Sequence, residues 1–202
     1  MLNSTVLEVS IGMLFCFGSV ALVASSLYEA IASILKLRAA SLLSGVKSLL
    51  NDPSFSDLAM KVYNHAMVNP RDGGVAKPGT PPAMKPSYIE PRAFAVALID
   101  SVGGLSTTFD QLKGKIDNIS NTQIRDLLAG MYERADNSVE KLRAQVAAWF
   151  DAGMDRVSGG YKRQAQLFTF LIGLAVAALL NIDTFHLFNT LWRHPEIAAK
   201  LP

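Results

Sequence analysis

The chain has 202 residues, of which 50% are hydrophobic and 18% are charged, and its formal net charge is only +2. Soluble domains carry about a quarter charged residues, so the deficit predicts that part of this chain is buried in lipid. The small net charge argues against nucleic acid as a partner, because such binding needs a strong basic field. The single cysteine, Cys16, cannot form an intrachain disulfide, and we expect it to fill space in an apolar helix.

The first uncharged run, residues 9–28, follows a short N-terminal segment, residues 1–8. As a helix, the run is long enough to cross a hydrocarbon core of about 30 Å. A cleaved signal peptide would need basic residues ahead of a shorter apolar stretch, and none precedes this one. The sequence therefore predicts an uncleaved transmembrane helix.

Residues 29–163 form an insert that is polar enough to live in water. Apolar residues at three- and four-residue steps predict that a helix continues to about residue 49, and a short amphipathic helix is expected at 55–67. Residues 69–86 contain five prolines and three glycines, a composition that excludes a regular helix or strand. We expect a mobile loop there.

Three further helices are expected in the rest of the insert. Pro91 suits the first position of a helix over 92–101. Ser120, with Gln123 three residues later, fits a capping box ahead of a helix over 121–134. A break at 136–138 precedes a helix that starts at Val139. No strand-like alternation is present, so the predicted class is all-α. We expect the insert to have too little apolar content for a large independent core. Its helices should instead pack against the helical extensions of the two spans, as a low bundle on the membrane surface.

The second apolar run, residues 164–182, is predicted to be another transmembrane helix, with an outward C-terminal segment at 183–202. Basic residues near the spans set the orientation. Those on the insert side are Lys36, Arg38, Lys47, Arg156, Lys162 and Arg163, whereas only Arg193 and Lys200 follow the second run. The predicted fold is therefore two transmembrane helices flanking a helical cytoplasmic insert, with both termini outward.

The segment WFDAGMDRVSGGYKR, residues 149–163, combines aromatic, acidic and basic residues just before the second run. Its candidate partner-binding or lipid-interface residues are Trp149, Phe150, Asp151, Asp155, Arg156, Tyr161, Lys162 and Arg163. On a helix the two aspartates share one face and repel each other. We therefore expect a cationic partner beside them, such as Arg92, Arg38 or a metal ion. The Gly159–Gly160 pair would let the chain bend before the span.

The plainest interpretation of this segment is a juxtamembrane helix whose aspartates form salt bridges or caps. A protein or lipid-headgroup site is the second interpretation. A catalytic or metal role is the third, and two aspartates alone are poor support for it.

The same segment, with the opening LNSTVLEVSIG and the stretch SYIEPRAFAVALID, resembles a family of uncharacterised bacterial membrane proteins. The resemblance implies a location in a bacterial inner membrane and an all-helical architecture. It implies no activity, because none is assigned to the family. Members continue into a further hydrophobic segment beyond the position of Pro202, so the total number of spans stays open.

Enzyme motifs are missing: the sequence has no phosphate-binding glycine loop, HExxH, CxxC or nucleophile elbow. His65, His186 and His194 stand apart, and His65 is expected on a helix surface. We therefore predict no catalytic, metal-binding or cofactor-binding residues. The leading hypothesis is a non-catalytic scaffold, anchor or accessory subunit that binds other membrane or cytoplasmic proteins, including copies of itself. The second is a subunit of an oligomeric transporter or channel.

Overall fold

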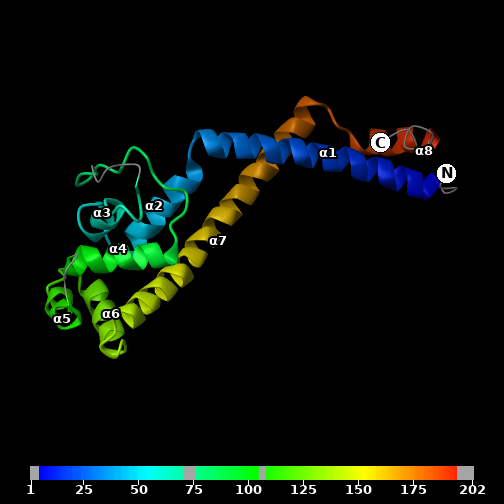
Figure 1. Cartoon of the computed structure of the whole chain (residues 1–202). Helices are drawn as coiled ribbons and strands as arrows, with labels where there is room; N and C mark the ends of the chain where they lie inside the picture. Colours follow the sequence, from blue (N-terminus) through cyan, green and yellow to red (C-terminus); the bar gives the residue numbers. More distant parts are fainter. Residues whose placement is uncertain (1–4, 71–75, 105–107, 195–202) are drawn as a thin grey trace. The chain divides into compact units, whose positions relative to one another are not determined.

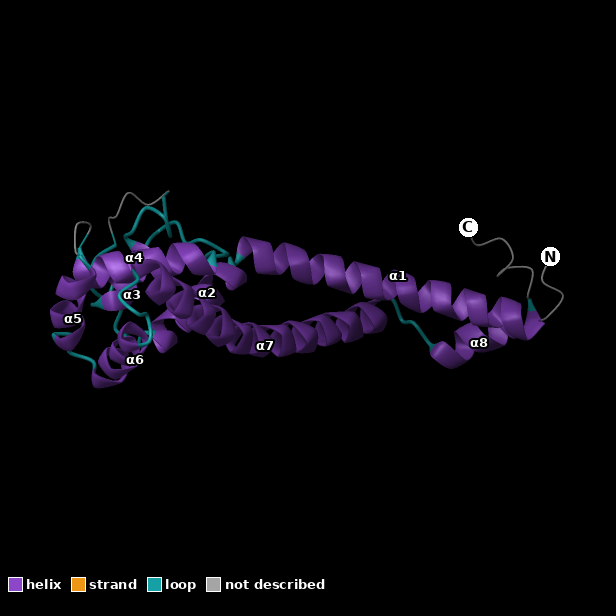
Figure 2. Ribbon diagram, turned by 60° about the horizontal axis from the view of Figure 1, so that its bottom comes forward, coloured by secondary structure: helices purple, strands orange, loops and turns teal. Residues whose placement is uncertain are grey.

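The computed structural model describes residues 5–70, 76–104 and 108–194 (Figures 1 and 2). Within these ranges the regular structure is entirely α-helical, and one isolated bridge joins Lys77 to Thr80. The helices are α1 (Thr5–Ile34), α2 (Leu37–Leu49), α3 (Leu58–Tyr63), α4 (Pro91–Gly103), α5 (Phe109–Asp117), α6 (Thr122–Glu133), α7 (Val139–Leu179) and α8 (Thr184–Arg193). The all-α prediction is confirmed for the described residues.

The chain divides into two compact units. We call residues 36–161 the insert unit, and residues 1–35 together with 162–202 the terminal unit. Helix α7 contributes its first half to the insert unit and its second half to the terminal unit.

A break separates α1 from α2, where the apolar stripe predicts one continuous helix. Lys36 adopts a left-handed backbone conformation, with φ of 50°. A residue in this region cannot continue a right-handed helix, so α1 ends at Ile34 and α2 starts at Leu37. The break coincides with the boundary between the two units.

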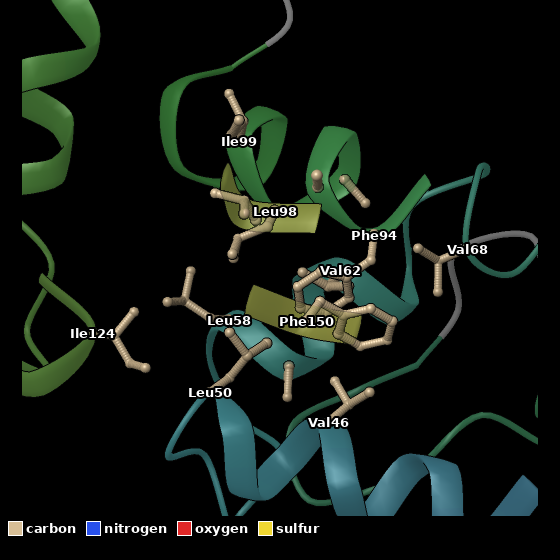
Figure 3. Close-up of a cluster of buried hydrophobic side chains, with 14 of the residues drawn as sticks. Val46, Leu50, Leu58, Val62, Val68, Phe94, Leu98, Ile99, Ile124 and Phe150 are labelled. Carbon is tan, nitrogen blue, oxygen red and sulfur yellow. The ribbon is translucent and has the colours of Figure 1, made fainter. Parts of the chain in front are cut away.

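The insert unit contains a large hydrophobic core, contrary to the expectation of too little apolar content. Val46 of α2, Phe94 and Leu98 of α4, and Val146 and Phe150 of α7 are at most 1% exposed (Figure 3). Helices α3, α5 and α6 add Val62, Leu112, Ile116, Ile124 and Leu128. The expectation failed because each helix offers only a few apolar residues, which become one core when six helices converge.

Local capping chemistry explains most helix starts in the insert unit. Pro91 occupies the first position of α4, as predicted, and the Glu90 carboxylate accepts a hydrogen bond from the Ala93 amide at 2.8 Å. Helix α6, however, is capped by Asn121, whose Oδ1 accepts a hydrogen bond from the Ile124 amide at 3.1 Å. The predicted capping box at Ser120 is therefore wrong. The predicted break at 136–138 is confirmed, with α7 starting at Val139.

We expected a mobile loop, but the proline- and glycine-rich segment is tied to the core in its described parts, residues 69–70 and 76–86. Asn64 binds Ala76 twice: its Nδ2 donates to the Ala76 carbonyl at 2.9 Å, and its Oδ1 accepts from the Ala76 amide at 3.0 Å. Asn69 is 3% exposed and donates to the Met84 carbonyl at 2.8 Å. Residues 71–75 of the predicted loop lie outside the described residues.

Asp52 organises the chain between α2 and α3. Its carboxylate is buried and accepts hydrogen bonds from the backbone amides of Ser56, Asp57 and Ala59 at 2.9–3.2 Å. Burial alone would raise the pKa of Asp52, but these backbone donors outweigh it and hold the pKa below its usual value of 3.8. These bonds hold the turn that leads into α3, which begins at Leu58 and is shorter than the helix predicted at 55–67.

The terminal unit is built around α1. Helix α8 packs beside the first half of α1, where Val9 and Leu191 are buried together and Met13 and Leu187 flank them. Gly173 of α7 lies next to Ala24 of α1. In both views α8 runs along α1 with its end toward the start of α1 (Figures 1 and 2).

One described helix, α1, is by itself long and apolar enough to cross a membrane. Helices α7 and α8 pass the same test only as a bent pair, with an angle of 61° between them. The segment 164–182 therefore does not form one straight helix: α7 ends at Leu179, and α8 begins at Thr184 in the segment expected to be outward.

Candidate functional sites

The predicted site at 149–163 lies on α7, where its aromatic and charged residues separate. Phe150 is 1% exposed and stacks on Phe94 at a ring-centroid distance of 3.9 Å. Trp149 is half-buried and tilts toward the same ring at 6.3 Å. Phe150 therefore packs in the core of the insert unit and offers no surface to a partner. Tyr161 is half-buried at the end of this unit.

The charged residues of the segment are exposed to solvent: Asp151, Asp155, Arg156, Lys162 and Arg163. Among the described residues, no ion pair involves Asp151 or Asp155. Arg92, one of the expected partners, instead pairs with Glu140 at 2.6 Å. No group of three or more potential metal ligands occurs in the part of the chain that the structure describes. Nothing there brings a cation to the two aspartates.

Helix α7 continues through Gly159 and Gly160 without a break, so the predicted bend is not observed. Both glycines leave open space where a side chain would project. Tight packing therefore does not require glycine at either position.

A polar cluster that the sequence did not reveal joins α4, α7 and the turn after α3. His65 Nε2 lies 3.5 Å from Asp100 Oδ2, and Arg143 Nη2 lies 3.9 Å from Asp100 Oδ1. Arg143 also pairs with Glu140 at 3.5 Å. His65 and Asp100 are about one-fifth exposed, so His65 is not the surface residue that we expected. His65, Asp100 and Arg143 are far apart in sequence, so no local spacing pattern predicts the cluster.

Both ring nitrogens of His65 are engaged. The Met67 amide donates to Nδ1 at 3.3 Å, so Nε2 is the nitrogen that carries the proton facing Asp100. The cluster links three elements of the insert unit by polar contacts.

The Tyr63 hydroxyl is a second buried polar group. The ring packs edge-on against Phe55 at 5.8 Å, and Oη has no hydrogen-bond partner among the described residues. Burial raises the pKa of Tyr63, so the phenol stays protonated across the physiological range. Its chemistry is that of a core aromatic side chain.

Large apolar side chains are exposed on every face of α1. Val6, Leu14, Leu22 and Ile34 are 60–78% exposed, and at 100° per residue they point in four different directions around the helix. The second half of α7 shows the same feature at Leu167, Phe170, Leu174 and Leu179. Water is a poor solvent for such a surface.

The insert unit exposes far less apolar surface. Met67, Met84 and Tyr88 are its large hydrophobic side chains that are more than half exposed. The Asn69–Met84 hydrogen bond brings the backbone of Met84 to the turn that follows Met67. We call Met67, Met84 and Tyr88 the methionine patch.

No known protein family, curated protein or solved structure matches the chain.

Proposed function

We propose that this chain is an integral protein of a bacterial inner membrane that presents the insert unit to protein partners in the cytoplasm, as a non-catalytic scaffold, anchor or accessory subunit. The exposed apolar circumference of α1 is the observation that carries the proposal. Glu8 and Glu29 bracket a 20-residue stretch with no charged side chain, which matches a hydrocarbon core of about 30 Å.

Exposed leucine and phenylalanine side chains on the second half of α7 support a second membrane segment. The orientation follows from exposed basic residues on the insert side, among them Lys36, Arg38, Lys162 and Arg163. With two membrane segments and this charge distribution, the insert unit faces the cytoplasm and the two ends of the chain face outward.

The methionine patch supports a protein-binding role for the insert unit. Methionine side chains are flexible and polarizable, which suits surfaces that adapt to a partner. Tyrosine supplies a large contact area with a polar tip, and it is enriched in protein interfaces. The buried Asn69 donates a hydrogen bond to the Met84 carbonyl, which anchors the backbone of Met84 at the core.

Membrane integration is tested by alkaline carbonate extraction, after which the protein should remain in the pellet. Orientation is tested with a single cysteine at the exposed Thr80 in a Cys16→Ser background. A membrane-impermeant maleimide should label Thr80→Cys only after the inner membrane is broken. Recovery in the carbonate supernatant would refute membrane integration, and labelling in intact spheroplasts would refute the orientation.

Partner binding is tested by placing a photo-crosslinking amino acid at Tyr88 and, as a control, at the exposed Asp151 on α7. Crosslinked protein complexes should form from Tyr88 and be reduced by a Met67→Asp/Met84→Asp double variant. If Tyr88 crosslinks to no other protein in cells while the purified protein turns over a substrate, the scaffold proposal is wrong.

A subunit of an oligomeric transporter or channel is the second candidate. The observation that favours it is the polar interruption at Asn181–Asp183 between α7 and α8. Flux through vesicles reconstituted with the purified protein tests this function directly.

A further inference from the structure

Helix α8 has three distinct faces. Leu187 and Leu191 face α1. An aromatic face is formed by Phe185, Phe188 and Trp192, which are 43–82% exposed. At 100° per residue, a third face carries His186, Asn189 and Arg193, and the N-cap residue Asp183 precedes them; all four are exposed. We call these four residues the polar stripe.

The polar stripe begins deep in the apolar part of the terminal unit. Leu191 packs at Val9, the first residue after Glu8. Asp183 lies eight residues before Leu191, which is about 12 Å along a helix. If the stretch between Glu8 and Glu29 spans a core of about 30 Å, Asp183 lies close to the middle of the bilayer. This step rests on the membrane location proposed above.

The break itself is locally satisfied. Asn181 turns the chain with φ of 51°, and Asp183 Oδ1 accepts hydrogen bonds from the amides of Phe185 and His186 at 2.8 and 3.2 Å. The other side chains of the stripe lack such partners: within the described ranges, the side chains of His186, Asn189 and Arg193 make no hydrogen bond or ion pair, and His186 is bonded only through its backbone. Ionisable groups at this depth face protein or water, because exposing them to lipid is costly.

We propose that a second copy of this chain covers the polar stripe, so that two α8 helices pack side by side and in parallel about a two-fold axis along the membrane normal. The aromatic face supplies the side that meets lipid, and the leucine face is already occupied by α1. The polar stripe is the face that remains for protein contact.

Asn189 and His186 of the polar stripe can each pair with the other copy, as a two-fold interface requires. Asn189 can both donate to and accept from the Asn189 carboxamide of the other copy. His186 is one helical turn from Asp183, an axial offset of about 4.5 Å, so each imidazole can donate to the carboxylate of the opposite copy. Asparagine and histidine pairs of this kind hold helices together inside membranes.

Cysteine crosslinking in native membranes tests the interface. In the Cys16→Ser background, single cysteines are placed at Asn189 on the polar stripe and at Phe188 on the aromatic face, which lie at the same depth on different sides of α8. With a short bis-maleimide, Asn189→Cys should give several-fold more crosslinked dimer than Phe188→Cys. Adding His186→Ala to the Asn189→Cys variant should reduce that yield.

Equal crosslinking from both positions would overturn the proposal, as would an uncrosslinked Asn189→Cys variant in protein that survives carbonate extraction. Labelling of Asn189→Cys by a membrane-impermeant maleimide without dimer formation would also overturn it, because the stripe would then face a water-filled path. Release of the protein by carbonate would instead refute the membrane location on which the inference rests.

Discussion

Gly45→Ala should destabilise the insert unit relative to the same substitution at Gly114, a helical glycine beside open space. This is expected although alanine is the better helix former. A Cβ atom at Gly45 would lie 2.8 and 3.0 Å from the two methyl groups of Val157, and 3.1 Å from Met154 Cε. Favourable carbon–carbon contacts lie at about 3.5–4.0 Å. Helices α2 and α7 approach so closely here that a methyl group has no room unless Val157 moves.

The expected size of the effect follows from two opposing terms. Overpacking a well-packed core costs about 1–3 kcal/mol, whereas replacing glycine by alanine inside a helix gains about 1 kcal/mol. The net change for Gly45→Ala is therefore between neutral and about 2 kcal/mol destabilising. Gly114 of α5 provides the control, because a Cβ there meets nothing within 4 Å and should give the helix gain alone. The two variants should differ by about 1–3 kcal/mol.

Thermal and urea unfolding of the full chain in detergent micelles, followed by pulse proteolysis of the insert unit, measures this difference. A change of 1 kcal/mol corresponds to a shift of about 2–8 °C in Tm for domains of such sizes. Val157→Ala should remove most of the penalty in a double-mutant cycle with Gly45→Ala. If Gly45→Ala is as stable as Gly114→Ala, or if Val157→Ala gives no rescue, the close contact between α2 and α7 is not as described.

Two other predictions concern the polar groups that hold the start of α3 and the neighbouring segment. Asp52→Ala removes a buried cap and should destabilise the insert unit by about 0.5–2 kcal/mol in urea unfolding. Folding lowers the pKa of Asp52, so its ionised carboxylate stabilises the folded state fully above about pH 4. This stabilisation is lost as the pH falls below the unfolded value of 3.8 and through the folded pKa. The free energies of unfolding of the wild type and Asp52→Ala should therefore converge in acid. Asn69→Ala should speed amide hydrogen exchange across residues 76–86 several-fold while leaving α6 unchanged; equal exchange in both proteins would show that the Met84 contact does not hold the segment.

Helix boundaries were predictable from sequence where one local interaction decides them. Pro91 has no backbone donor to lose at the first helical turn, and the polar run at 136–138 competes with helix through its own side chains. At the start of α6, two adjacent residues both suit a cap. The sequence favoured Ser120 because Gln123 completes a capping box, but Asn121 makes the observed bond. Local rules identify the turn and leave an error of one residue.

Features that depend on distant residues were not predictable in the same way. The Lys36 break carries neither glycine nor proline, and the apolar stripe continues across it. The contact between His65 and Asp100 joins residues 35 positions apart, and helical periodicity cannot predict such pairs. In the predicted site, periodicity placed Asp151 and Asp155 on one face of a helix, and both are exposed there. It could not tell that Phe150 would meet Phe94 in a core.

The distribution of exposed apolar surface links the fold to the proposed function. Apart from the methionine patch, the large hydrophobic side chains exposed in the described residues belong to the terminal unit. Within the insert unit, residues of the same types are buried in one core. A single aqueous environment would favour burial in both units, because apolar burial drives folding wherever water is the solvent. The contrast therefore favours two different solvents for one chain. The polar stripe of α8 and the methionine patch of the insert unit depart from this distribution, and each is a place where we expect another protein to bind.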